Sequence, residues 1–139
     1  DLRNRLGVSH PKLLAVIQRM EETVENPMTC AELARQAGVS SRQLERLFSK
    51  YLGHSPTRHY LSVRLERARF LLLQTSMPIL SVAMACGFVS ASHFSKSYSE
   101  HFGCTPSTER RVRKPGQSDS SHGPTARMAR RSKLETQSR

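Results

Sequence analysis

One segment occurs twice in this sequence. Residues 32–56 (ELARQAGVSSRQLERLFSKYLGHSP) and residues 81–106 (SVAMACGFVSASHFSKSYSEHFGCTP) share small, polar and large apolar residues at matching places. The paired glycines, Gly38 and Gly87, are offset by 49 positions and the paired serines, Ser40 and Ser90, by 50, so the second copy has one extra residue in between. A repeated segment folds as a repeated supersecondary unit. The chain is therefore expected to contain one small structural unit twice.

Each copy has the pattern of two helices joined by a tight turn. Thr29 with Glu32, and Ser40 with Gln43, form capping boxes, which start a helix by pairing its first backbone N–H groups. Gly38 stands between the two helices, where glycine takes the left-handed conformation without steric cost. Two short helices joined in this way form the helix-turn-helix motif, whose second helix can enter the major groove of DNA. The residues expected to face inward are Leu33, Ala34, Ala37, Leu44, Leu47 and Phe48 in the first copy, and Ile79, Val82, Ala83, Cys86, Phe88, Phe94, Tyr98 and Phe102 in the second.

A long uninterrupted helix is expected between the two copies. Ser55 suits its cap, Pro56 its first position, and apolar residues follow at helical spacing through Leu72. About 19 residues at 1.5 Å each span roughly 28 Å, comparable with the ~34 Å between successive major grooves on one face of DNA. Further helices are expected at 10–25 and from Thr105 to Arg111, so the sequence predicts an all-α fold of about seven helices with no strand.

The domain organisation follows from these elements. We expect a linker remnant at 1–9, a helix-turn-helix domain at 10–111 and a basic tail at 112–139, whose Pro, Gly and Ser content is typical of disorder. Within the domain, the first helix-turn-helix subdomain covers 10–54, the linker helix 55–75 and the second subdomain 76–111.

Charge and composition narrow the function. The 139 residues have a net charge of +11, which favours a polyanionic partner such as nucleic acid or an anionic membrane surface. The sequence has no signal-peptide pattern and no apolar run of about 18 residues that could cross a membrane, so it favours a cytoplasmic protein. The three cysteines are widely spaced, and no catalytic triad, carboxylate pair or Gly-rich phosphate loop is present. Neither a metal, a cofactor nor an enzymatic activity is expected.

The second copy is similar to a known family. Its stretch GFVSASHFSKSYSEHFGCTPS, with RQLERLF in the first copy, resembles the C-terminal DNA-binding domain of AraC/XylS-type bacterial transcription regulators over residues 10–111. RQLERLF and RLERAR look most like the branch that has a glutamine-amidotransferase-like (DJ-1/PfpI-like) N-terminal sensing domain. The resemblance implies double-stranded operator DNA as the partner, RNA polymerase as a possible second partner, and a sensing domain outside this chain. Many relatives have an aromatic residue where this chain has Glu109, so the last helix is expected to dock less firmly.

The second helix of the first copy supplies the candidate DNA contacts Ser41, Arg42, Glu45, Arg46 and Lys50. Arginine can bind guanine O6 and N7 with two donors, and glutamate can accept from cytosine N4. Glu45 could instead orient an arginine, and Ser41 could reach a phosphate or a base. Lys50 is expected at a phosphate, as is Arg58 of the linker helix. The alternative for each of these charged residues is a solvated helix face.

The equivalent helix of the second copy supplies Ser90, Ala91, Ser92, His93 and Lys96. Ser90 suits a helix cap first. Ala91 could touch a thymine methyl group or simply permit close approach of the backbone. His93 is expected at a phosphate or a base, because no second metal ligand stands at a matching spacing, and the other histidines are expected at surface or boundary positions.

The leading hypothesis is sequence-specific binding of double-stranded DNA by a bacterial transcription regulator. The alternative is a non-specific architectural DNA- or RNA-binding protein that uses only its charge. Such a protein has no need of a doubled, groove-spaced motif, so the repeat favours the first hypothesis.

Overall fold

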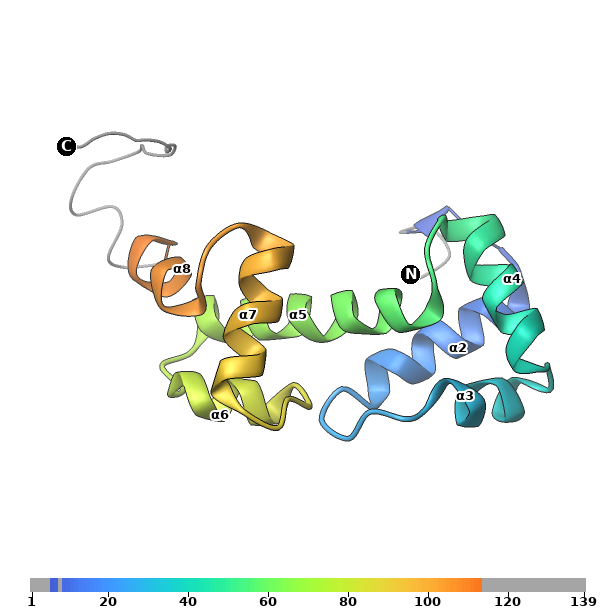
Figure 1. Ribbon diagram of the computed structural model, residues 1–139, viewed down its shortest axis with the longest axis horizontal. Helices are drawn as coiled ribbons and strands as arrows, with labels where there is room; N and C mark the ends of the chain where they lie inside the picture. Colours follow the sequence, from blue (N-terminus) through green and yellow to red (C-terminus); the bar gives the residue numbers. More distant parts are fainter. Residues whose placement is uncertain (1–5, 8, 114–139) are drawn as a thin grey trace.

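The computed structural model describes residues 6, 7 and 9–113, and this part of the chain is all-α (Figure 1). The all-α prediction is confirmed, with no strand among the described residues. All but the first two residues of the expected disordered tail lie outside the described part, and those two belong to the last helix. The seven helices, labelled as in Figure 1, are α2 (Pro11–Glu22), α3 (Cys30–Ala37), α4 (Ser41–Leu52), α5 (Pro56–Gln74), α6 (Ile79–Ala85), α7 (Ala91–Phe102) and α8 (Pro106–Arg113).

The helix boundaries lie where the capping signals predict them. Thr29 and Glu32 form the expected capping box at the start of α3, and Ser40 and Gln43 form the one at the start of α4. Gly38 ends α3 with a left-handed backbone, φ 75°. The prediction differs at two ends: α2 is shorter than expected, and α8 continues two residues past the expected end.

A longer repeat than the two motifs becomes visible in the structure. Leu13, Val16 and Met20 of α2 are buried, and so are Leu65, Ala68 and Leu72 of α5, each 52 positions later. The first unit is thus α2, α3 and α4, and the second unit is α5, α6 and α7. Each unit has its own hydrophobic core. The linker helix is therefore also the first helix of the second unit.

The two units are joined along α5 and at the loop that follows α2. Tyr60, near the start of α5, is buried in the core of the first unit, and its hydroxyl lies 2.6 Å from Thr23 Oγ1 and accepts from the backbone N–H of Met28 at 2.8 Å. Val24, from the loop, is buried in the core of the second unit. Each core therefore contains a side chain from the other unit, which fixes the spacing between them.

The turn of the second unit lies close against the same loop. Gly87 has φ 83°, a left-handed value that an L side chain rarely adopts. A Cβ atom there would lie 2.6 Å from both the carbonyl oxygen of Val24 and the Cγ of Pro27. Only glycine therefore lets the second turn approach the first unit this closely.

Polar contacts fasten α8, which corrects the expectation that Glu109 weakens its docking. Glu109 is 3% exposed and accepts a 2.6 Å hydrogen bond from the Tyr98 hydroxyl. Its Oε1 also forms an ion pair with Arg69 Nε at 3.4 Å. Arg110 donates to three backbone carbonyl groups at the end of α5 and just beyond it. These are the carbonyl groups of Leu72, Thr75 and Met77. The carboxylate thus has partners that an aromatic residue could not use.

The expected core is largely confirmed, and one difference has a physical cause. His59 is buried, whereas a surface or boundary position was expected. Its ring packs against Phe48 and stacks on His54, with 3.0 Å between His54 Nε2 and His59 Nδ1, because the start of α5 packs on the first unit.

Candidate nucleic-acid interface

The second helices of the two motifs, α4 and α7, are the candidate recognition helices. Figure 1 shows them near opposite ends of the described fold, with α5 between them. In this view both helices run in the same direction from their N-terminal ends. The 19 residues of α5 form one unbroken helix. At 1.5 Å per residue this helix is roughly 28 Å long, comparable with the ~34 Å between successive major grooves on one face of DNA.

The polar face of α4 is strongly basic. Arg42, Arg46 and Lys50 recur at four-residue spacing and are all exposed, as are Ser41 and Glu45. The opposite face buries Leu44 and Phe48 in the core of the first unit. All five predicted residues of this helix are therefore on the surface.

The equivalent face of α7 is smaller and less charged. Ala91, Ser92, His93 and Lys96 are exposed, whereas Ser90 is half-buried. Ser90 Oγ accepts from the backbone N–H of His93 at 3.1 Å, which confirms its role as a cap. The ring of His93 lies edge-on to Phe88, with centroids 5.5 Å apart.

A cationic side chain reaches the turn of each motif from the helix before it. In the second unit, Arg64 donates from Nε to the carbonyl of Cys86 at 2.9 Å and from Nη2 to that of Gly87 at 2.8 Å. Its guanidinium lies 4.3 Å from the centroid of Phe88, and burial lowers its pKa. In the first unit the equivalent residue, Lys12, has only a 3.5 Å contact from Nζ to the carbonyl of Gly38, and it is exposed.

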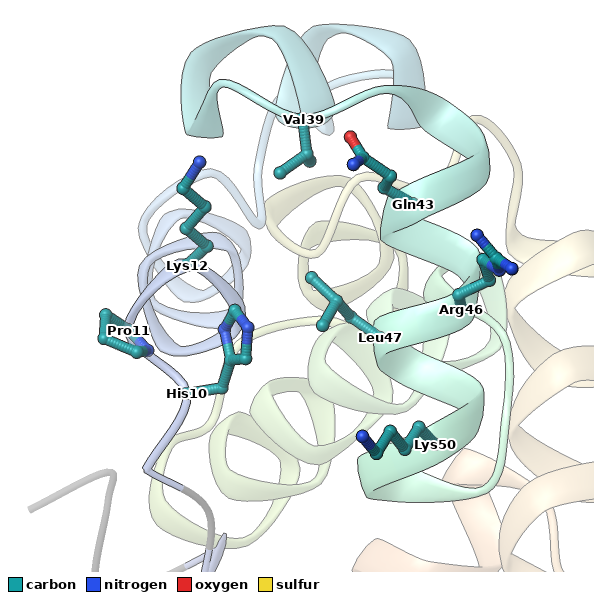
Figure 2. A pocket seen from close by; sticks show the side chains of 8 residues that line it. All are labelled: His10, Pro11, Lys12, Val39, Gln43, Arg46, Leu47 and Lys50. Atoms are coloured by element: carbon teal, nitrogen blue, oxygen red, sulfur yellow. The ribbon is translucent and has the colours of Figure 1, made fainter.

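A groove runs between the start of α2 and one flank of α4 (Figure 2). Lys12 lies across the groove from α4, Lys50 points over it toward His10, and Leu47 projects into it (Figure 2). Lys12 and His10 were not predicted from the sequence, because they precede the helix-turn-helix motif by more than a dozen residues. The signal that could have found them is the 52-residue repeat. The groove is lined by His10, Pro11, Lys12, Val39, Gln43, Arg46, Leu47 and Lys50.

A second groove overlaps the equivalent place in the second unit, although the counterparts of Lys12, Gln43 and Arg46 do not line it. It lies between the first part of α5 and α7 and includes Arg58, Ser97 and Glu100. Ser97 and Glu100 stand at the positions that Leu47 and Lys50 occupy in the first unit. The predicted phosphate contact Arg58 is exposed at its edge. Its lining is His54, Arg58, Leu61, Ser62, Ser97, Glu100 and His101.

Residues 6, 7 and 9–113 contain neither a membrane-spanning helix nor a cluster of metal ligands. None of the helices there is long and apolar enough to cross a membrane. No group of three or more His, Cys, Asp or Glu side chains is placed there to hold a metal ion. Cys86 is buried, and burial raises the pKa of its thiol to about 11.

Two helix-turn-helix motifs on one rigid linker helix, each with an exposed second helix, define a DNA-binding domain of the doubled type. The family model described as a helix-turn-helix domain matches residues 33–112. The chain belongs to this family, and the described part is an AraC-type DNA-binding domain. The predicted family is thereby confirmed.

Similar proteins agree with this assignment. The HTH-type transcriptional regulator GbdR of Pseudomonas aeruginosa is 53% identical over 116 residues, which cover 84% of this chain and 32% of that protein. The crystal structure of an AraC-type DNA-binding domain-containing regulator from Chromobacterium violaceum has a TM-score of 0.73 at 48% identity, covering 76% of this chain and 95% of that one. The DNA-binding domain of AdpA, solved in complex with a target DNA, has a TM-score of 0.70 at 26% identity, covering 76% and 97%. The chain thus spans about a third of the length of the curated relative GbdR.

Proposed function

We propose that this chain is the DNA-binding part of a bacterial transcription regulator that reads a bipartite operator, with α4 and α7 in successive major grooves. The observation that carries the proposal is the pair of exposed helices, α4 and α7, joined through the unbroken α5, whose length of roughly 28 Å is comparable with the ~34 Å between successive major grooves. We further propose that the protein acts in the cytoplasm on chromosomal DNA. The relative GbdR is about three times as long as the matched part, which leaves room for a sensing domain in the full-length protein, and RNA polymerase is proposed as a second partner because the relatives are transcriptional regulators.

The first unit supplies most of the sequence preference in this proposal. Arg42 and Arg46 are exposed on one face of α4, and each can make a bidentate contact to a guanine. Glu45 accepts from a cytosine or orients an arginine, and Ser41 binds a phosphate or base near the helix start. Lys50, at the far end of the helix, binds a phosphate.

The second unit adds affinity more than preference. Ser92, His93 and Lys96 are shorter or less directional than the arginines of α4, and Ala91 offers only a methyl group. Ser90 is already used as the cap of α7. Lys96 is assigned to a phosphate, so Lys96→Ala should weaken all sequences alike, whereas Arg46→Ala should relax preference at one or two base positions.

A change in spacing tests the bipartite arrangement. Duplexes selected for binding should contain two elements centred about 10–10.5 base pairs apart. Inserting five base pairs between the elements turns the second to the opposite face of the DNA, so specific binding should be nearly abolished. The same insertion outside the two elements is the control. Unchanged affinity after the central insertion would contradict the proposal, and equal binding to random duplex or RNA would favour the architectural alternative.

A further inference from the structure

We propose that the groove between α2 and α4 holds one sugar–phosphate strand of the bound DNA, with Lys12 as a phosphate contact supplied from outside the helix-turn-helix motif. This inference rests on the proposed DNA binding by α4. It adds a helix, α2, to the interface and assigns a ligand to a groove that the recognition residues alone do not explain.

The position of the groove is the first argument. A helix with its side chains is about 10–12 Å across, and the major groove is about 12 Å wide. A recognition helix therefore fills the groove, and each of its flanks faces one of the two strands that border it. Arg46 and Lys50 belong both to the exposed face of α4 and to the lining of this groove. With α4 in the major groove and Arg46 at the bases, one of the two bordering strands then passes along the flank of α4 that faces Lys12.

The chemistry of the lining is the second argument. None of the eight described residues that line the groove is acidic. Lys12 comes from one wall, beside Gly38 at the start of α4, and Lys50 comes from the other wall near the end of α4, so a strand that runs along the groove would meet an ammonium group at each end (Figure 2). Val39, Leu47 and Pro11 supply apolar surface, which suits contact with deoxyribose rings. Cationic walls with an apolar floor match the alternation of phosphate and sugar along a strand.

The freedom of Lys12 is the third argument. Its Nζ lies 3.5 Å from the carbonyl of Gly38, at the outer limit of a hydrogen bond, and the side chain is exposed. The equivalent residue of the second unit, Arg64, makes two short hydrogen bonds to its turn. Arg64 thus stabilises its turn through two short hydrogen bonds, whereas Lys12 makes one long contact. Moving the Lys12 ammonium group to a phosphate therefore loses little interaction free energy within the fold.

The test measures affinity of the 139-residue chain for its selected duplex and for random duplex across a range of salt. Lys12→Ala should lower affinity about three- to tenfold on both duplexes and reduce the magnitude of the salt slope by about one. Lys12→Arg should keep the wild-type values. Arg67→Ala is the control, because Arg67 is an exposed cation that lines a different hollow, with Glu66 and Phe70.

A second measurement identifies the strand. Replacing the phosphates beside the first element by neutral methylphosphonates should weaken the wild-type protein and weaken Lys12→Ala less, because the variant has already lost that contact. Thermal unfolding should show Lys12→Ala within a few degrees of the wild type.

The outcomes separate this inference from the function on which it rests. Unchanged affinity and salt slope for Lys12→Ala, while Arg46→Ala relaxes base preference, would overturn the groove proposal and leave DNA reading by α4 intact. A wild-type protein that selects no sequence at all would overturn the proposed function, and the groove proposal with it.

Discussion

The two units share a backbone plan but use their equivalent cations differently. Arg64 in the second unit is half-buried, bonds two carbonyl groups of the turn and stacks on Phe88. Lys12 in the first unit is exposed and makes one long contact. A repeat can thus keep a positive charge at one position while the contacts of that charge differ between the two copies. The cation of the second unit holds its turn, whereas the cation of the first unit stays exposed, where we propose that it contacts a DNA phosphate.

The recognition helices diverge in the same sense. At equivalent places, 50 positions apart, α4 has Arg46 and Lys50 where α7 has Lys96 and Glu100. The apolar faces remain alike, with Phe48 and Tyr98 both buried. The buried faces thus remain largely apolar even where the residue differs, whereas the exposed faces differ in charge.

The paired turn glycines give the largest expected difference between the units. Gly38→Ala should cost about 1–2 kcal/mol, the price of a left-handed alanine, since its Cβ would meet only Lys12 Nζ at 3.8 Å. Gly87→Ala should cost about 3–4 kcal/mol, because its Cβ would also lie 2.6 Å from the backbone oxygen of Val24. Denaturant unfolding of both variants measures the difference. Equal losses would show that the loop after α2 does not press on the second turn.

Replacing Arg64 or Lys12 by alanine compares how much each cation stabilises the turn that it contacts. Arg64→Ala should destabilise the fold by about 2–3 kcal/mol, because the carbonyl groups of Cys86 and Gly87 lose a charged donor. Lys12→Ala should change stability by less than about 0.5 kcal/mol, as expected for an exposed side chain with one long contact. Unfolding midpoints at matched protein concentration provide the measurement. A comparable loss for Lys12→Ala would place that residue in the fold rather than at the interface.

Local signals in the sequence were sufficient for the helices and for the exposed recognition faces. The capping boxes at Thr29 and Ser40 depend only on neighbouring residues, so a three-residue spacing predicted both helix starts. The length of α5 followed from the absence of any breaker between Pro56 and Gln74. Whether the predicted residues of α4 and α7 contact DNA stays a prediction.

Contacts between distant segments could not be predicted from the sequence. In the sequence alone, Glu109 is a charged residue with no identifiable partner. Its partners Tyr98 and Arg69 lie beside it only in the folded structure. Burial, together with the hydrogen bond to Glu109, raises the pKa of Tyr98. The groove beside α4 likewise exists only once α2 has folded back along it, so Lys12 had no visible partner in the sequence. Periodicity identifies faces, whereas partners across the fold require the tertiary structure.

The first unit has Lys50 where the second unit has Glu100, and this difference in charge gives the smallest and most specific expected effect on DNA affinity. If both grooves lie beside a DNA strand, Glu100 repels phosphates that Lys50 attracts in the first unit. Glu100→Lys should therefore raise affinity about five- to tenfold, roughly 1 kcal/mol, and Lys50→Glu should lower it by a similar factor. Both effects should shrink as salt is raised, because the groups are exposed and screened.

A matched charge change separates this local effect from net charge. Glu66→Lys adds the same charge to an exposed position that lines a different hollow, with Arg67 and Phe70. Titration of labelled duplex at two salt concentrations should rank Glu100→Lys well above Glu66→Lys, because Coulomb attraction falls with distance and is screened beyond about 10 Å at 0.1 M salt. Equal gains from the two variants would mean that only total charge matters, and the second groove would then lie away from the DNA.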